Sequence, residues 1–316
     1  MNAPESWSER IELYLSDRRN AGFNVSGDIT RLRQFACFAD LRKAAQPHLT
    51  VMLAVEWARS SKHQRPITWA RRLEVLRCFA KYWQRFDPLT EVPPSGLLGR
   101  AYRRLVPHVF TEQEVSALMA ATDQYISRDS LRSATCKTMF GLLGSCGLRP
   151  AEAIRLTRAD VDLDNGVLFI GEAKGHRSRW VPLHQSVTNA LCTYAQLRNR
   201  VVAEPPNDRF FLLDNGHPAS VGTIQRALEM LCGKLGWLPR GDYAHHRCYD
   251  FRHSFIVNTL LHLHQIGIDA DHAILPLSTY VGHTSIAHTY WYCTATPELM
   301  AIVGECFHRY ALGDPS

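Results

Sequence analysis

The residues of this chain that could carry out chemistry are concentrated between residues 245 and 292. This stretch contains Arg252, His283 and the phenol of Tyr292 among apolar residues. A buried arginine requires an anion, because an unpaired charge away from water is costly. No acidic residue occurs between residues 253 and 267, so the anion could come from outside the protein. A phosphate held by both arms of the guanidinium would satisfy the charge, and a solvated arginine on a surface helix is the alternative.

A second arginine occurs upstream, in a turn that fixes its backbone. Arg149 precedes Pro150, which disfavours helical geometry at the preceding residue and places Arg149 at a helix entrance. Glu152, in the first turn of that helix, suits the helix dipole and is placed to brace the arginine. A second arginine favours the phosphate interpretation, although an ordinary turn with an Arg–Glu pair remains the alternative.

Lys174 lies in a loop between two short β-like runs, residues 167–170 and 179–183. The spacing predicts a hairpin with this lysine at its tip. An amine on a mobile turn suits a proton donor that reaches into a closing site. A solvated turn lysine is the alternative interpretation.

The composition is that of a globular protein with room for two domains. The 316 residues are 46% hydrophobic and 21% charged, as in folded rather than disordered chains. No apolar run reaches the roughly 20 residues that cross a bilayer, and the N-terminus lacks the regions of a signal peptide. Nine cysteines, scattered singly, indicate reduced thiols in a cytoplasmic protein rather than a disulfide framework.

Positive charge is concentrated in the first third of the chain. Residues 1–106 hold 18 basic and 10 acidic residues, a surplus of eight, whereas the remainder holds 18 basic and 20 acidic residues. This asymmetry predicts a phosphate-tracking module joined to a more neutral body. An ordinary basic helical bundle would have the same composition.

Helices are expected to dominate the first part. Residues 8–86 have helical periodicity, clearest over residues 66–86, where a proline suits the first helical turn. That helix carries Arg71, Arg72 and Lys81 away from its apolar stripe, which fits a DNA major groove. The aromatic stripe itself is more typical of a core.

Prolines and glycines between residues 87 and 107 interrupt the periodicity and predict a linker. Thr111 and Glu114 then have the spacing of a capping box, which begins a new helix. The domain boundary is therefore expected near residue 106. The second part has mostly helical patterning and the hairpin.

The motifs occur in one order that resembles the tyrosine recombinase (phage integrase) family. They are Gly-Leu-Arg149-Pro-Ala-Glu152, Lys174-Gly-His-Arg-Ser-Arg before Val-Pro-Leu, Asp250-Phe-Arg252-His-Ser-Phe, and Gly282-His283 with Tyr292 nine residues later. Glu152 matches the family's acidic position that orients the first arginine. The resemblance extends over residues 107–310. It implies a mainly α fold with a small antiparallel β-sheet, comprising a helical DNA core-binding domain with linker (1–106) and a catalytic domain (107–316).

The resemblance implies site-specific DNA recombination by covalent catalysis. Tyr292 would attack a DNA phosphodiester and form a 3′-phosphotyrosyl link, conserving bond energy so that strands rejoin without ATP. Arg149 and Arg252 would hold the non-bridging oxygens, and His283 would hydrogen-bond the phosphate. Lys174 would protonate the leaving 5′-oxygen. No cofactor or metal is implied, because the arginines neutralise the charge.

Two tyrosines require separate consideration. The family has a histidine three residues before the second arginine, where this chain has Tyr249. Either its phenol donates a hydrogen bond, which we favour, or His245 or His246 substitutes. Tyr290 precedes Tyr292 by two residues, about 200° around a helix, so the two cannot face one phosphate. The spacing from the Gly-His motif selects Tyr292.

The implied partner is a double-stranded DNA recombination site, bound by a homo-tetramer or by a dimer at each site, with no membrane involved. An amphipathic run over residues 297–310 would dock onto a neighbouring subunit or pack on its own core. Integration, excision and transposition of a mobile element would use the same residues, so the sequence leaves the element and its DNA site open.

Three other functions share part of this pattern. A DNA-binding protein that has lost catalysis conflicts with the complete set of Arg, Lys, Arg, His and Tyr. A type IB topoisomerase-like enzyme shares the chemistry, but the Gly-His motif and the C-terminal run favour exchange between sites. A metalloprotein is suggested by the fifteen histidines, among them His262, His264, His272, His283 and His288. On a helix the rings of His262 and His264 point apart, and no carboxylate or cysteine completes a site.

Overall fold

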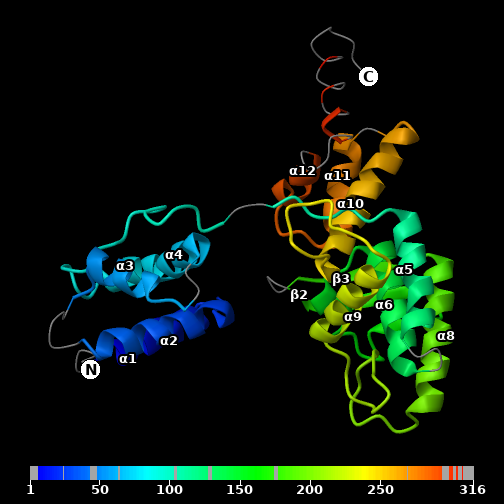
Figure 1. The fold of residues 1–316 in the computed structure, drawn as a ribbon, viewed down its shortest axis with the longest axis horizontal. Coiled ribbons are helices and arrows are strands. Elements are labelled where there is room, and N and C mark those ends of the chain that lie inside the picture. Colours follow the sequence, from blue (N-terminus) through cyan, green and yellow to red (C-terminus); the bar gives the residue numbers. More distant parts are fainter. Residues whose placement is uncertain are drawn as a thin grey trace. The chain divides into compact units, whose positions relative to one another are not determined.

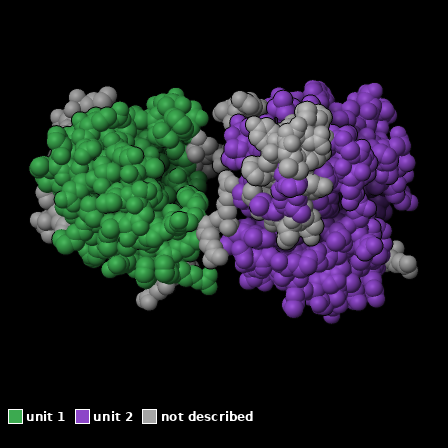
Figure 2. Space-filling model, turned by 90° about the horizontal axis from the view of Figure 1, so that it is seen from above, with its two compact units in different colours: residues 1–104 green, residues 105–316 purple. Residues whose placement is uncertain are grey.

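The computed structural model describes residues 6–23, 25–42, 48–62, 65–102, 105–126, 130–173, 177–268, 270–293, 299–301, 304 and 308. The chain forms two compact units, residues 1–104 and 105–316 (Figure 2). The boundary predicted from the sequence was near residue 106. The described part is mainly helical, with one three-stranded antiparallel sheet (Figure 1). The predicted fold class is confirmed.

The described part of the first unit comprises helices around an aromatic core. They are α1 (Trp7–Asn20), α2 (Ser26–Asp40), α3 (Val51–Arg59) and α4 (Pro66–Trp83). Helix α4 begins at the expected proline and ends three residues before its predicted end. Its aromatic stripe faces inward, since Phe79 and Trp83 are buried and stack with 5.9 Å between ring centroids. The stripe therefore belongs to the core.

In the second unit, α6 and α10 pack against each other and against most of the other helices. The described elements are α5 (Glu112–Tyr125), α6 (Leu131–Cys146), α7 (Pro150–Ala153), β1 (Val161–Asp162), β2 (Val167–Ala173), β3 (Arg177–Pro182), α8 (Gln185–Val201), α9 (Val221–Lys234), α10 (Cys248–Gln265), α11 (Ala270–Val281) and α12 (Ala287–Cys293). The rings of Phe110, Phe140 and Phe251 stack in the core between α6 and α10.

The sheet has the strand order β1-β2-β3, and β2 pairs with β3 as the predicted hairpin. Both strands extend further toward the tip than predicted, and Lys174, predicted to lie at the tip, is outside the described residues. Because side chains alternate across a strand, Arg179 and Val181 share one face, on which Val181 is fully buried. Trp180 points the other way and is 65% exposed.

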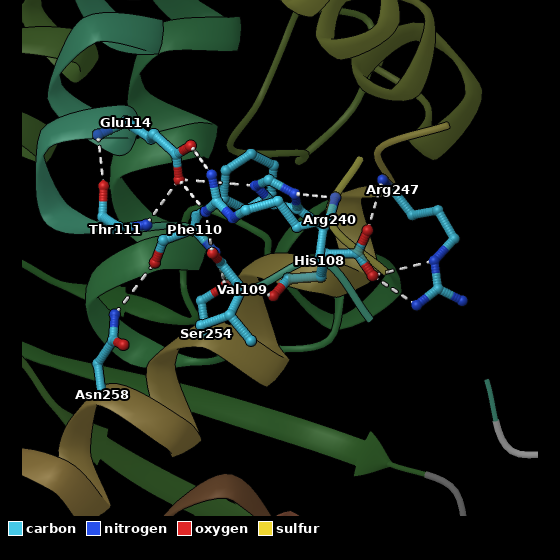
Figure 3. Close-up of polar contacts among 10 residues, drawn as sticks. His108, Val109, Phe110, Thr111, Glu114, Arg240, Arg247, Ser254 and Asn258 are labelled. Carbon is cyan, nitrogen blue, oxygen red and sulfur yellow. Dashed lines mark hydrogen bonds and ion pairs between the residues drawn. The ribbon is translucent and has the colours of Figure 1, made fainter. Parts of the chain in front are cut away.

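Residues 106–111, which precede α5 and which we call the strap, are hydrogen-bonded to α10 (Figure 3). The backbone N–H of Phe110 donates to Ser254 Oγ at 2.7 Å, and Asn258 Nδ2 donates to Phe110 O at 3.1 Å. The Phe110 ring stacks on Phe251 with 4.6 Å between centroids. These contacts flank Arg252 on α10, so the strap fixes the turn of helix that carries it.

Arg240 binds both the strap and the first turn of α5 (Figure 3). Its guanidinium binds both carboxylate oxygens of Glu114 and donates to Val109 O at 2.6 Å. Its backbone N–H donates to Nδ1 of His108 at 3.2 Å. Burial, followed by the charges of Arg240 and His246, lowers the pKa of His108 to about 4. A neutral imidazole therefore accepts this bond at neutral pH.

Candidate active site

Arg252 is a fully buried arginine held by backbone carbonyl groups. Nη1 donates to Gly147 O at 2.9 Å and Nη2 donates to Val281 O at 2.7 Å. Its Nε has no hydrogen-bond partner, and no carboxylate pairs with it, within the described part of the chain. Burial and then the charge of Arg149 lower its pKa to about 10, so the group remains a cation at neutral pH.

Arg149 enters the same site from the start of α7. Its extended backbone, with φ −67° and ψ 137°, is what the following proline requires. Nη1 donates to Glu152 Oε1 at 2.5 Å, and Nη2 donates to Gly282 O at 2.9 Å. Glu152 also accepts the backbone N–H of Arg149 at 3.1 Å, so one carboxylate braces both the main chain and the side chain of the arginine.

A third arginine, Arg179 of β3, shares the same carboxylate. Nη2 donates to Glu152 Oε2 at 2.9 Å, and Nε donates to Tyr280 O at 2.9 Å. Arg179 was not among the predicted site residues. The alternation of side chains along the predicted strand could have identified Arg179, because it places this charged side chain on the buried face beside Val181.

His283 follows the end of α11, and its ring lies beside that of Tyr292 near the end of α12. Their rings lie nearly parallel, at 10° and 6.2 Å between centroids, and Tyr292 is only 3% exposed. His283 Nδ1 is hydrogen-bonded to Thr289 Oγ1 at 2.7 Å. Burial, then the charges of Arg252 and Arg149, lower the pKa of His283 to about 3, so its imidazole is neutral at neutral pH. Tyr290 is 43% exposed, in keeping with the expected separation of the two phenols.

Tyr249 lies at the edge of this cluster and His253 lies within it. The ring of His253 is 5.1 Å from that of Tyr249 and 5.3 Å from that of Tyr292, between centroids. Burial, then the charges of Arg247 and Arg252, lower the pKa of His253 to about 3. The prediction missed His253, although its spacing of four residues from Tyr249 on one helix was the signal for a shared face.

The two histidines considered as substitutes for Tyr249 lie elsewhere. His246 is buried against the rings of His108 and Phe110, at 4.4 and 5.7 Å between centroids, and its carbonyl accepts from Gln225. His245 lies on the surface, 3.8 Å from Glu229. Neither histidine makes a described contact with Arg149, Arg252, His283 or Tyr292.

The predicted DNA-binding residues occupy different environments on α4. Arg71 is exposed, and its Nε donates to Ala101 O at 3.1 Å. Arg72 is half-buried with its guanidinium 4.2 Å from the centre of the Trp57 ring, whereas Lys81 is exposed. Arg72 is therefore partly committed to the core of its own unit.

Two absences concern the described residues alone. No group of three or more His, Cys, Asp or Glu side chains there could hold a metal ion. No described helix is long and apolar enough to cross a membrane.

Comparison with known proteins identifies relatives that match most of the chain. The phage integrase family model matches residues 108–298. A candidate integrase/recombinase of Sinorhizobium fredii, y4rB, is 35% identical over 299 residues, covering 93% of this chain and 95% of that protein. The tyrosine recombinase XerC of Chlamydia muridarum is 26% identical, covering 77% of this chain and 72% of its own length.

Two solved structures share the fold at low sequence identity. The XerH site-specific recombinase bound to a palindromic difH substrate has a TM-score of 0.66 and 15% identity, covering 96% of this chain and 85% of that one. The Tn1549 transposon integrase in complex with transposon right end DNA has a TM-score of 0.64 and 18% identity, covering 90% of this chain and 94% of that one.

Gly282 is expected to tolerate no side chain, because its backbone and Arg179 together exclude one. Its φ is +69°, and an added Cβ would meet Arg179 Nη1 at 2.7 Å. Gly267 has φ +81° with nothing within 4 Å of an added Cβ, and it is the matched control. Gly267→Ala should lower the unfolding free energy by about 1–2 kcal/mol through backbone strain alone. Gly282→Ala should lower it further, as measured by denaturant unfolding. Equal losses would mean that Arg179 moves aside freely.

Proposed function

Because the chain belongs to the phage integrase family of tyrosine recombinases, we propose that it cleaves and rejoins DNA strands at specific sites through a covalent link to Tyr292. The observation that supports this most strongly is the meeting of Arg149, Arg252, His283 and Tyr292 from separate segments of the chain. Guanidinium groups beside a phenol suit phosphoryl transfer, in which catalysis is largely positioning and charge stabilisation.

In the proposed reaction the Tyr292 hydroxyl releases its proton to solvent while its oxygen attacks the phosphorus and expels the 5′-oxygen of the strand, leaving a 3′-phosphotyrosyl link. Arg149 and Arg252 bind the non-bridging oxygens. When Thr289 donates to Nδ1 of His283, the ring proton resides on Nε2 and can be donated to the phosphate. Lys174 protonates the leaving 5′-oxygen by analogy with the family. Attack by the freed hydroxyl of another strand reverses these steps and rejoins the DNA.

The nucleophile is tested by covalent capture. Nicked DNA duplexes of randomised sequence are incubated with the wild-type chain, and the DNA that becomes covalently linked to the protein is recovered and sequenced. A duplex of the recovered sequence, called the captured duplex, is the substrate for the variants. Tyr292→Phe should abolish the adduct, whereas Tyr290→Phe, which removes the exposed phenol two residues away, should retain it. An adduct formed by Tyr292→Phe would refute the assignment.

No cofactor or metal is required in this proposal, because the two arginines neutralise the phosphate charge. Adduct formation by the wild-type chain should therefore persist in excess chelator. Loss of the adduct, restored only by a divalent cation, would show that the reaction requires a bound metal ion and would favour the metalloprotein alternative.

We propose that Tyr249 supplies the hydrogen bond that a histidine makes in most of the family. Tyr249→Phe should slow adduct formation by on the order of 10²-fold, the usual cost of one lost donor to a charge-stabilising site, with little change in DNA affinity. Tyr249→His should remain active, because an imidazole presents a donor from the same position. His246→Phe is the control for the rejected substitute. A silent Tyr249→Phe combined with a damaging His246→Phe would reverse the assignment.

The first unit is proposed to supply phosphate contacts, because the positive surplus of the chain lies there. Lys81 and Arg71 are exposed on α4 and are better placed for DNA than Arg72. Replacing both with glutamine should make the plot of the logarithm of the DNA association constant against the logarithm of salt concentration less steep. The negative slope should shrink by about 0.9 for each lost contact. An unchanged slope would assign the phosphate contacts to other residues.

Recombination between two sites requires several subunits, and we propose a tetramer on DNA with a dimer at each site. An apolar groove of about 720 Å³ between α5, α6, α8 and α10 supports this, because it could receive the amphipathic run 297–310 of a neighbour. The structure describes only residues 299–301, 304 and 308 of that run. The names of y4rB and the Tn1549 integrase favour a mobile element as the biological context.

The groove is tested with a charge placed inside it. Ala190 is exposed and lines the groove, whereas its neighbour Asn189 does not. Ala190→Arg should abolish complexes that hold two DNA duplexes in a gel-shift assay while retaining the adduct on a single captured duplex. Asn189→Arg adds the same charge outside the groove and should leave both unchanged. Paired complexes formed by Ala190→Arg would exclude the groove as the docking site.

A further inference from the structure

Glu152 lies between two arginines, only one of which was predicted to use it. Its side chain is 8% exposed, and those of Arg149 and Arg179 are 23% and 11% exposed. Burial alone would raise the pKa of Glu152, but its hydrogen bond to Arg179, the charges of Arg179 and Arg149 and its hydrogen bond to Arg149 hold that pKa below its usual value. The carboxylate is therefore ionised, and the three side chains together carry one net positive charge.

The guanidinium of Arg179 connects three segments that are distant in sequence. It comes from β3, which forms a hairpin with β2, and Arg179 pairs there with Ile170. Through Glu152 it contacts α7, and through Tyr280 O it contacts the end of α11. Its Nη1 also lies against Gly282, whose carbonyl receives Arg149.

We propose that Arg179 is a positioning residue that acts on the reacting phosphate through Glu152 and Arg149. This inference rests on the function proposed above. By occupying the carboxylate, Arg179 prevents Glu152 from cancelling the charge of Arg149, so that a full positive charge faces the phosphate. Arg179 donates to both carboxylate oxygens of Glu152, so its charge lies directly against that carboxylate.

A residue that only held the fold together would behave differently from one that acts through a shared carboxylate. Without the charge of Arg179, Glu152 neutralises Arg149 and the phosphate loses stabilisation. Removing the charge of Glu152 as well frees Arg149 again. The second change should therefore restore activity that the first removed, whereas removing two structural contacts lowers stability further.

The experiment measures the single-turnover rate of adduct formation on the captured duplex at saturating protein. Arg179→Gln should slow it by on the order of 10²-fold, whereas Arg179→Lys, which retains the charge, should retain most of the rate. Arg179→Gln combined with Glu152→Gln should be faster than Arg179→Gln alone. Arg198→Ala removes another buried guanidinium, one that donates to Phe210 O, and should lower the unfolding temperature without changing the rate.

The outcomes test the role of Arg179 and the proposed function separately. A double variant no faster than Arg179→Gln, or an Arg179→Lys as slow as Arg179→Gln, would overturn the charge-based role of Arg179. If Arg179→Gln fails to fold, the comparison of Arg179→Lys with wild type decides, and a loss as large as that of Tyr292→Phe overturns the inference. Absence of any adduct with the wild-type chain would refute the proposed function itself.

Discussion

The second unit is organised around more buried positive charge than its fold neutralises. Three arginines converge from α7, β3 and α10, and the described part of the chain supplies them with one carboxylate, that of Glu152. The described hydrogen bonds of Arg252 go to carbonyl groups at the ends of α6 and α11. Such charge is costly away from water. The same cost favours binding of an anion at this cluster.

Two glycines in left-handed backbone conformations make this arrangement possible. Gly147, with φ +58°, ends α6 and directs its carbonyl to Arg252, and a Cβ there would meet the Phe255 ring at 2.3 Å. Gly282, with φ +69°, directs its carbonyl to Arg149. In both places the absence of a side chain lets a turn approach closely while its carbonyl serves an arginine. The glycines of the two short motifs are thus parts of the charge-holding structure.

The imidazoles and the strap complete the surroundings of the arginines. His253 and His283 contact the Tyr292 ring and remain neutral at neutral pH, because burial and the neighbouring arginines oppose a further positive charge. The strap approaches α10 beside Arg252 through the Phe110–Phe251 stack. A substitution in the strap would therefore alter the packing of α10, the helix that carries Arg252.

The sequence by itself determined what depends on local chemistry. It predicted the proline that begins α4, the capping box of Thr111 and Glu114, and the hairpin, because each depends on neighbouring residues. It also predicted that Glu152 is placed to brace Arg149, three residues away. The fold class followed from the resemblance of the ordered motifs to a known family. Only the tertiary structure placed Arg179 and His253 in the site and His246 outside it. Those outcomes depend on contacts such as Arg179 with Tyr280, which lie 101 residues apart, and local spacing shows which face a side chain occupies but not what packs against that face.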